Sequence, residues 1–292
     1  MMKSQAAMEY LMTYGWAILV IAVVLAALYS LGIFNPSTFA PKASAGSCEV
    51  VRPFGPGTTT DISLEGTCTN MLPKYVASFN GGNSYSYIPD LSNPTGSSLS
   101  YSVWFYLNKI PDNNAGIIYA NNSTQSYYDT PLSLFPNGNC NLQVYLHNSS
   151  DVTFSKDSSL CLDSHKWYQV TAFVNQFSHE YGLYIDGNLS FTGTFEGKLS
   201  KADGFYIGLF YPQGAYFPGY IANVQIYNTA LSANQISALY QEGIGGDPIN
   251  PNHLVAWYPL NGNANDYSGN DYNGKAVNVG YSSTWYRTYS AP

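Results

Sequence analysis

Hydrophobic positions divide this chain into two unlike parts. No charged residue occurs between Glu9 and Lys42, and residues 16–28 are almost all Ala, Ile, Leu and Val. About 20 helical residues span a bilayer, so this stretch predicts a membrane-spanning helix that stops before Asn35-Pro36. Short apolar runs separated by Gly, Asn, Asp and Pro follow, and they predict strands and turns. We expect an N-terminal helix within residues 1–34, a linker at 35–47 and a mainly β domain at 48–292.

Strand patterns recur through the predicted β domain. Tyr101, Val103, Phe105 and Leu107 alternate with Ser102, Trp104 and Tyr106. Both faces of this strand therefore carry apolar bulk, and the strand is expected to be covered on both. The predicted strands are 75–79, 100–107, 116–119, 141–147, 167–174, 181–185, 204–209 and 219–227.

Two further local signals are specific. Asp186-Gly187 lies between two apolar runs, and both residue types tolerate positive φ, so a tight hairpin is predicted. Residues 232–242 predict the one clear helix of the domain, because Ser232 and Gln235 have the spacing of a capping box and Gly243 follows.

The carboxylate of Glu9 stands at the edge of the apolar run, where its burial is costly unless a cation pairs with it. A cleaved secretory signal and a plain signal anchor are the simpler interpretations of this region. Residues 3–12 (KSQAAMEYLM), however, resemble the class III signal peptide of archaeal type IV pilin-like proteins, with Ala7 where Ser is usual.

That resemblance assigns roles to Lys3, Ser4, Gln5 and Glu9. It implies that a prepilin peptidase cuts between Ser4 and Gln5 and that the apolar helix is retained. It also implies self-association, in which Glu9 pairs with the new amino terminus of a neighbouring subunit inside a filament.

The β domain resembles the LamG-like, concanavalin A-like jelly roll. The resemblance is carried, in family order, by residues 77–85 (ASFNGGNSY), 102–106 (SVWFY), 167–170 (WYQV), 183–187 (LYIDG), 217–221 (FPGYI) and 225–232 (QIYNTALS). Residues 254–270 resemble the segment that usually opens such a domain, yet here they stand near the C-terminus. Circular permutation explains this order, and the start of a second domain is the alternative.

The composition limits the kinds of partner that the chain can be expected to bind. Charged residues make up 10% of the chain, Tyr numbers 27 and the formal net charge is -7. Such a chain has no basic face to neutralise phosphates, so we expect no nucleic-acid partner. The membrane and, at the outer surface, glycans are the expected partners.

Four cysteines form an even set without a CxxC pair, which favours two disulfides in an oxidising exterior over zinc. Pairing neighbours gives Cys48 with Cys68 and Cys140 with Cys161, the connectivity with the shortest loops. Spacing does not exclude other pairings, and reduced buried thiols are the alternative.

Catalytic patterns are absent from the sequence. The histidines are scattered, no nucleophile elbow occurs, and the paired-carboxylate motif of glycosidases with this general fold is missing. We therefore expect no enzyme activity.

Calcium is the one cofactor considered. Asp266, Ser268 and Asn270 offer oxygen ligands from one short loop, and the resemblance implies a calcium at the rim of the jelly roll. The alternative is that these residues stabilise an Asx-type turn. In addition, Ala222 stands where the family usually has an acidic ligand.

Aromatic loops are the candidate ligand contacts. Tyr127, Tyr128, Tyr211 and Tyr216 could stack on sugar rings or pack on a neighbouring subunit. Sequons at Asn121, Asn122, Asn148 and Asn188 predict N-glycosylation of surface positions.

The sequence thus predicts a cell-surface pilin-like structural subunit whose head mediates adhesion or binds glycans or proteins. A membrane-anchored carbohydrate-binding or receptor module that does not polymerise is the alternative.

Overall fold

The computed structural model describes residues 18–24, 48–51, 63–66, 72–93, 96–122, 130–290 and 292, with the backbone alone at 48–51 and 63–66. Residues 18–24 are helical, and the rest of the predicted N-terminal helix lies outside the described residues. Within the part that is described, no helix combines the length and the hydropathy needed to cross a bilayer.

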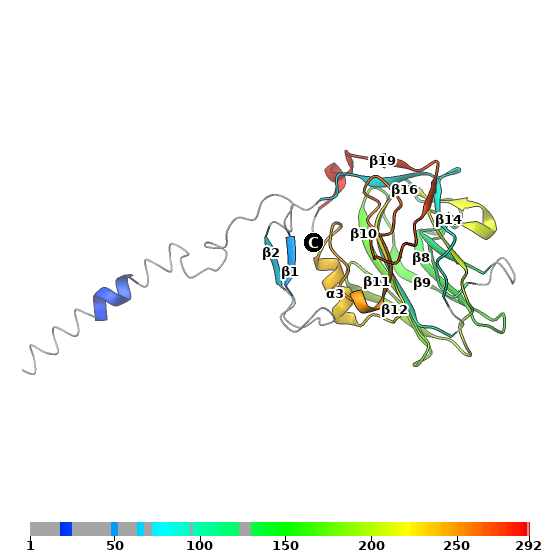
Figure 1. Cartoon of the computed structure of the whole chain (residues 1–292), viewed down its shortest axis with the longest axis horizontal. Coiled ribbons are helices and arrows are strands. Elements are labelled where there is room, and N and C mark those ends of the chain that lie inside the picture. The colour runs from blue at the N-terminus through cyan, green and yellow to red at the C-terminus, as the bar shows by residue number, and fades with distance from the viewer. Residues whose placement is uncertain are drawn as a thin grey trace, which may run out of the picture.

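Strands dominate the domain (Figure 1). They are β1 (Cys48–Val51), β2 (Ser63–Gly66), β3 (Val76–Asn80), β4 (Tyr85–Ile88), β5 (Leu99–Leu107), β6 (Ile118–Asn121), β7 (Ser133–Pro136), β8 (Asn141–His147), β9 (Thr153–Cys161), β10 (Trp167–Asn175), β11 (Glu180–Ile185), β12 (Asn188–Thr194), β13 (Gly204–Ile207), β14 (Leu209–Phe210), β15 (Ala215–Tyr216), β16 (Pro218–Tyr227), β17 (Leu254–Tyr258), β18 (Lys275–Val277) and β19 (Gly280–Ser282). The helices are α3 (Ala233–Gln241) and the 3-10 turns η2 (Tyr211–Gln213), η3 (Pro251–His253) and η4 (Trp285–Thr288).

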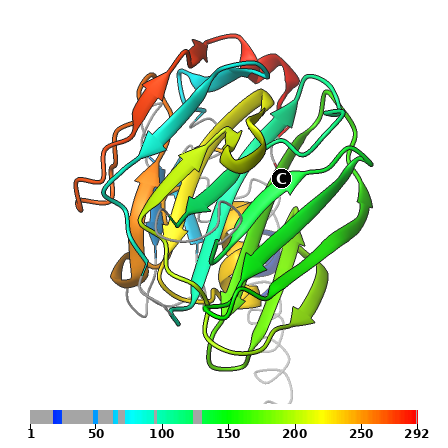
Figure 2. The same cartoon turned by 90° about the vertical axis from the view of Figure 1, so that its right-hand side faces the viewer.

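Two antiparallel sheets form a sandwich. The larger sheet has eight strands in the order β12-β11-β10-β5-β16-β3-β19, with β17 also paired to β16. The smaller sheet has seven, in the order β18-β4-β13-β6-β7-β8-β9. Figure 2 looks onto the smaller sheet, in which cyan β4 and yellow β13 are separated from the green strands β8 and β9 by β6 and β7. A mainly β sandwich with jelly-roll character is therefore confirmed.

The core lies between the two sheets, where alternate residues of each strand meet. On β5 the residues Tyr101, Val103, Phe105 and Leu107 point into it and are fully buried, as their alternation predicts. Trp104, on the opposite face of β5, belongs to a separate buried cluster, so this strand is covered on both sides.

Helix α3 covers part of the outer face of the larger sheet. Ile236 and Leu239 pack there against Tyr227 of β16. The predicted capping box is present, because Ser232 accepts the Gln235 N–H and the Gln235 side chain accepts the Ser232 N–H. Gly243, just after the helix, has φ of +76°, which agrees with its predicted role as a stop.

The C-terminal segment completes both sheets. Strand β17 pairs with β16, β18 with β4, and β19 with β3. The backbone N–H of Tyr75 donates to Asn261 Oδ1 at 2.8 Å, and Trp285 Nε1 donates to the Pro73 carbonyl at 3.2 Å. These residues therefore belong to this domain and do not begin a second one. The two ends of the domain meet, which is the condition that the predicted permutation requires.

Most predicted strands agree with the structure to within a residue or two, but one was wrong in extent. The predicted strand 204–209 is interrupted at Gly208, whose φ is +81°. A Cβ there would lie 2.3 Å from the Phe79 ring, so the chain bends at a position that only glycine can occupy. The bend separates β13 from β14.

Candidate ligand-binding site

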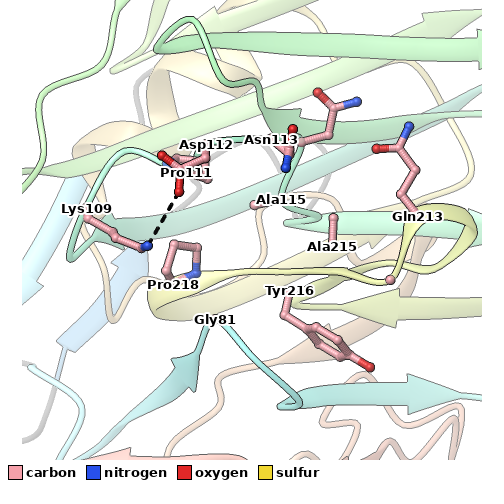
Figure 3. A pocket seen from close by; sticks show the side chains of 12 residues that line it. Gly81, Lys109, Pro111, Asp112, Asn113, Ala115, Gln213, Ala215, Tyr216 and Pro218 are labelled. Atoms are coloured by element: carbon pink, nitrogen blue, oxygen red, sulfur yellow. Dashed lines mark ion pairs between the residues drawn. The ribbon is translucent and has the colours of Figure 1, made fainter.

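An open groove of about 470 Å³ lies at the rim of the sandwich. It is formed where the turn after β3, the loop from β5 to β6 and the β14–η2–β15 hairpin come together. In Figure 3 the side chains of Asn113 and Gln213 lie on one side of the β15 backbone, and the Tyr216 ring points away from them on the other side.

The groove is polar and electrically balanced. Lys109 Nζ lies 3.9 Å from Asp112 Oδ2, and this exposed pair supplies one charge of each sign (Figure 3). Asn113, Asn114 and Gln213 add carboxamides, each of which can donate and accept hydrogen bonds. Such a lining suits an uncharged ligand rich in hydroxyl groups.

The hairpin that forms one wall has a defined local cause. Strand β14 pairs with β15, as Leu209 opposes Tyr216 and Phe210 opposes Ala215. Gly214 ends η2 in the left-handed region, and its N–H donates to the Tyr211 carbonyl at 3.1 Å. Phe210 is buried against Phe135, with ring centroids 4.6 Å apart, so the hairpin is fixed on the sheet while Tyr211 stays 42% exposed.

A row of tyrosines continues from the groove across the outer face of the smaller sheet. We call Tyr85, Tyr87, Tyr206 and Tyr211 the tyrosine ladder. Tyr87 and Tyr206 are opposite each other in the β4–β13 register and stack at 4.7 Å, and Tyr206 stacks on Tyr211 at 4.9 Å. The ring centroids of Tyr85 and Tyr216 are 6.3 Å apart, so Tyr85 connects the ladder to the groove.

The ladder has an acidic end. Burial raises the pKa of Tyr87, and the nearby carboxylates of Asp203 and Asp90 raise it further. Burial also raises the pKa of Tyr206 well above its usual value, with smaller contributions from neighbouring phenols. The phenols of Tyr87 and Tyr206 therefore stay protonated at neutral pH and can donate hydrogen bonds.

The predicted ligand residues are partly brought together. Tyr216 lines the groove and Tyr211 ends the ladder, whereas Tyr127 and Tyr128 lie outside the described residues. Sequence reasoning missed Tyr85, Tyr87 and Tyr206. The sequence does indicate these positions, because the three tyrosines alternate along their strands with the buried residues Ser86, Ile88 and Phe205. Alternation places the tyrosines on the face of the sheet opposite the core.

The residues predicted to bind calcium are not arranged as an open metal site. Asp266 Oδ1 accepts the N–H groups of Trp257 and Ser268, and Oδ2 accepts the Ser268 hydroxyl and the Tyr272 N–H. Asn270 directs its Nδ2 to the carbonyls of Leu254 and Val255. Donors thus surround the carboxylate where a cation would bind, so the residues do not fit calcium and match the Asx-turn alternative. Over the described ranges, no group of three or more His, Cys, Asp or Glu side chains could hold a metal.

The predicted glycosylation sites differ in exposure. Asn188 is exposed and stays a candidate. The expectation of a surface position is wrong for Asn122 and Asn148, which are 2% and 5% exposed. Asn148 Nδ2 donates to the Glu196 carbonyl at 2.8 Å, so the atom that a glycan would modify is enclosed. Asn121, at the end of β6, is half-buried.

One of the two predicted disulfides is confirmed. Cys140 and Cys161 are bonded, with Cα atoms 4.9 Å apart. The predicted Cys48–Cys68 bond lies outside the described side chains, and the processing residues Lys3, Ser4, Gln5 and Glu9 lie outside the described residues altogether.

The two packed antiparallel sheets define a β-sandwich of the jelly-roll class. Residues 80–237 match the family model described as the concanavalin A-like lectin/glucanases superfamily. The chain therefore belongs to this superfamily. No curated protein sequence matches it.

Solved structures share the fold at low sequence identity. A putative carbohydrate binding protein from Bacteroides ovatus is 18% identical with a TM-score of 0.55, over 76% of this chain and 63% of that one. The chain thus spans less than two thirds of that protein. A native heptameric SAP-like pentraxin from Limulus polyphemus is 15% identical with a TM-score of 0.52, over 71% of this chain and 94% of that one.

Proposed function

We propose that this domain is a non-catalytic carbohydrate-binding module that takes its ligand in the rim groove. The observation that carries the proposal is the groove itself, which is lined by Tyr216 and by the carboxamides of Asn113 and Gln213 and in which the charges of Lys109 and Asp112 cancel. An aromatic ring packs on the C–H face of a sugar, and carboxamides bind its hydroxyl groups. The similar Bacteroides ovatus structure, described as a putative carbohydrate binding protein, supports the same class of ligand.

Binding of the full-length chain to immobilised glycans tests this proposal, in a detergent that has no sugar headgroup. Gln213→Ala and Asn113→Ala each remove a hydrogen-bonding group, so each should weaken binding by roughly 3- to 10-fold. Asn234→Ala is the matched control and should leave binding unchanged, because Asn234 is an exposed carboxamide on α3, which does not line the groove. Binding that is equally strong in all three variants would refute the groove as the site.

The module is proposed to lack hydrolytic activity, as the missing carboxylate motif suggests. Release of reducing ends from any bound polysaccharide would overturn this part of the proposal.

The N-terminal sequence supports a location for the module at the cell surface. Lys3, Ser4, Gln5 and Glu9 favour processing by a prepilin peptidase and self-association of the retained helix in a filament. The competing proposal is a membrane-anchored module that does not polymerise. Mass spectrometry of the native protein separates them, because Gln5 as first residue supports the pilin-like form and Met1 contradicts it.

A further inference from the structure

The sequence contains four Asn-Gly steps, which begin at Asn80, Asn137, Asn261 and Asn273. In such a step the backbone nitrogen of the glycine can attack the carboxamide of the asparagine, because glycine has no Cβ to hinder the approach. The reaction needs a backbone N–H that is free to lose its proton and a carboxamide that can turn toward the nitrogen. The fold determines which of the four steps meets both conditions.

Two of the steps have a glycine that is already hydrogen-bonded. The Gly81 N–H donates to the Phe217 carbonyl at 3.1 Å, and the Gly274 N–H donates to the Ala264 carbonyl at 2.9 Å. The carboxamide before each of these glycines also accepts at least one hydrogen bond. Attack by either nitrogen therefore requires the fold to open locally first.

A third step is enclosed. Asn137 is 7% exposed, and its Oδ1 accepts the N–H groups of Asn139 and Asn141 at 3.0 and 3.1 Å. These bonds fix the carboxamide inside the turn between β7 and β8, so it cannot rotate toward Gly138 without breaking them.

The Asn261 step differs in both respects. Asn261 and Gly262 are exposed, and the Gly262 N–H has no hydrogen-bond partner among the described residues. A single hydrogen bond holds the carboxamide, in which Oδ1 accepts the Tyr75 N–H at 2.8 Å. Gly262 has φ of +92°, so the fold itself favours the glycine that makes this step reactive.

The bond between Asn261 and Tyr75 joins the two ends of the domain. Tyr75 stands directly before β3, whereas Asn261 follows β17 in the C-terminal segment. The bond from Trp285 Nε1 to the Pro73 carbonyl is a second contact between the same two segments. A chemical change at Asn261 therefore acts where the first and last parts of the domain meet.

We propose that Asn261-Gly262 is a site of spontaneous deamidation and that the isoaspartate product opens the contact with Tyr75. The Gly262 nitrogen forms a bond to Asn261 Cγ, the Cγ–Nδ2 bond breaks, and ammonia leaves with the proton of the Gly262 N–H. Water then opens the cyclic imide at either carbonyl and gives aspartate or isoaspartate. Isoaspartate adds a methylene to the main chain, which moves the acceptor oxygen away from the Tyr75 N–H. This modification is independent of the proposed glycan-binding function.

Peptide mass spectrometry of the full-length chain, incubated folded at mildly alkaline pH, measures the gain of about 1 Da at each Asn-Gly step. Asn261 should convert at least ~10-fold faster than the other three, because those react only after local opening. In urea the four rates should converge. No conversion at Asn261 in the folded chain, or an equal rate at any other step, overturns the site. A preference for Asn261 that persists in urea overturns the role of the fold.

Asn261→Gln identifies the reacting residue within its peptide. The longer side chain forms a cyclic imide far more slowly, so this variant should lose the mass gain. A gain that persists in Asn261→Gln would assign the reaction to another asparagine and overturn the proposal.

Hydrogen exchange of the peptide that contains Tyr75 tests the opening of the contact. The isoaspartate form, separated by chromatography, should exchange the Tyr75 amide several-fold faster than the unmodified chain. Asn261→Asp is the matched control, since it makes the other product directly and keeps the acceptor oxygen in place, so its exchange should stay slow. Equal exchange in the isoaspartate form and the unmodified chain overturns the opening. Fast exchange in Asn261→Asp overturns the role of the added methylene.

Discussion

A single carboxylate organises the loop after β17. Asp266 accepts three backbone N–H groups and one hydroxyl, all from residues within nine positions of it along the chain. Hydrogen bonds to a charged acceptor are stronger than neutral ones, and removing the acceptor leaves its donors without partners. Asp266 is therefore a stabilising residue of the fold.

Asp266→Ala should lower the free energy of unfolding by about 2 to 3 kcal/mol, because several donors lose their charged partner. Ser268→Ala removes the hydroxyl and keeps the backbone contacts, so its effect should be closer to about 1 kcal/mol. Urea unfolding measures both. Equal stability of Asp266→Ala and the unmodified chain would contradict this role.

Calcium should not change the melting temperature of the domain, because N–H and O–H donors already occupy the Asp266 oxygens. Thermal unfolding in calcium and in a chelator makes the comparison. A calcium-dependent rise in melting temperature that Asp266→Ala removes would restore the metal site predicted from the sequence.

Buried phenols make the fold sensitive to alkali. The pKa of Tyr289 is raised from 10.0 to about 12, mainly by burial; the hydrogen bond from the Ile244 N–H opposes this shift, and the neighbouring Tyr240 contributes to it. Between these two pKa values the folded chain holds a proton that the unfolded chain releases. The stabilisation is therefore complete below pH 10 and is lost as the pH rises toward 12.

Urea unfolding at a series of pH values above neutrality should show stability that declines from about pH 10 upward, together with late ionisation of tyrosines by ultraviolet absorbance. Tyr289→Phe should make the decline shallower. The same slope in both proteins would exclude Tyr289 as a contributor.

At the scale of elements, the β8–β9 hairpin is joined covalently near one end. The Cys140–Cys161 bond connects residues that are 21 apart in sequence, next to the pairing of Asn141 with Cys161. Strand β9 is largely exposed at the edge of the smaller sheet, so it has little burial of its own to hold it there.

Replacing both Cys140 and Cys161 by Ser should lower the free energy of unfolding by about 3 kcal/mol, because the open loop gains conformational entropy in the unfolded chain. Denaturant unfolding measures this loss, and addition of a reductant to the unmodified protein should approach it. An unchanged midpoint in the double variant would contradict the prediction.

The sequence predicted the elements with strong local signals. The Asp186-Gly187 hairpin is confirmed, with φ of +49° and +73°, and so is the capping box of α3. Strand β9 was missed because its sequence TFSKDSSLC has little apolar alternation, and its pairing with β8 is a tertiary effect. The ladder was missed for a related reason. Tyr87 and Tyr206 are 119 positions apart in the chain, and only the β4–β13 register brings them together.

At the scale of the whole molecule, strands from opposite ends of the domain share both sheets. Strand β3, near its start, is hydrogen-bonded to β19, near its end. Strand β17, which resembles the family's opening strand, pairs with β16 beside β3. The order of segments along the chain is thus separable from their positions in the fold, as the predicted permutation requires.

A rearranged chain tests the permutation. It would begin at Asn250, continue to Pro292, and connect through a short Gly/Ser linker to residues 72–249, which restores the family order. We expect cooperative unfolding and glycan binding like those of the original head, because Trp285 and Asn261 already contact residues at the start of the domain.

Truncation after His253 is the comparison, since it removes β17, β18, β19 and the buried Trp285. It should abolish cooperative unfolding. A truncated head that still unfolds cooperatively would show that the C-terminal segment is an accessory.

The position of β3 has a mechanical consequence. Strand β3 follows directly after residues 73–75, and the residue after its last one, Asn80, is Gly81 at the groove. If the N-terminal side is tethered and the groove holds a ligand, tension runs along this one strand. Strand β3 is bonded to β16 on one edge and to β19 on the other, so a pull along it loads both sets of hydrogen bonds in shear and does not peel an edge open.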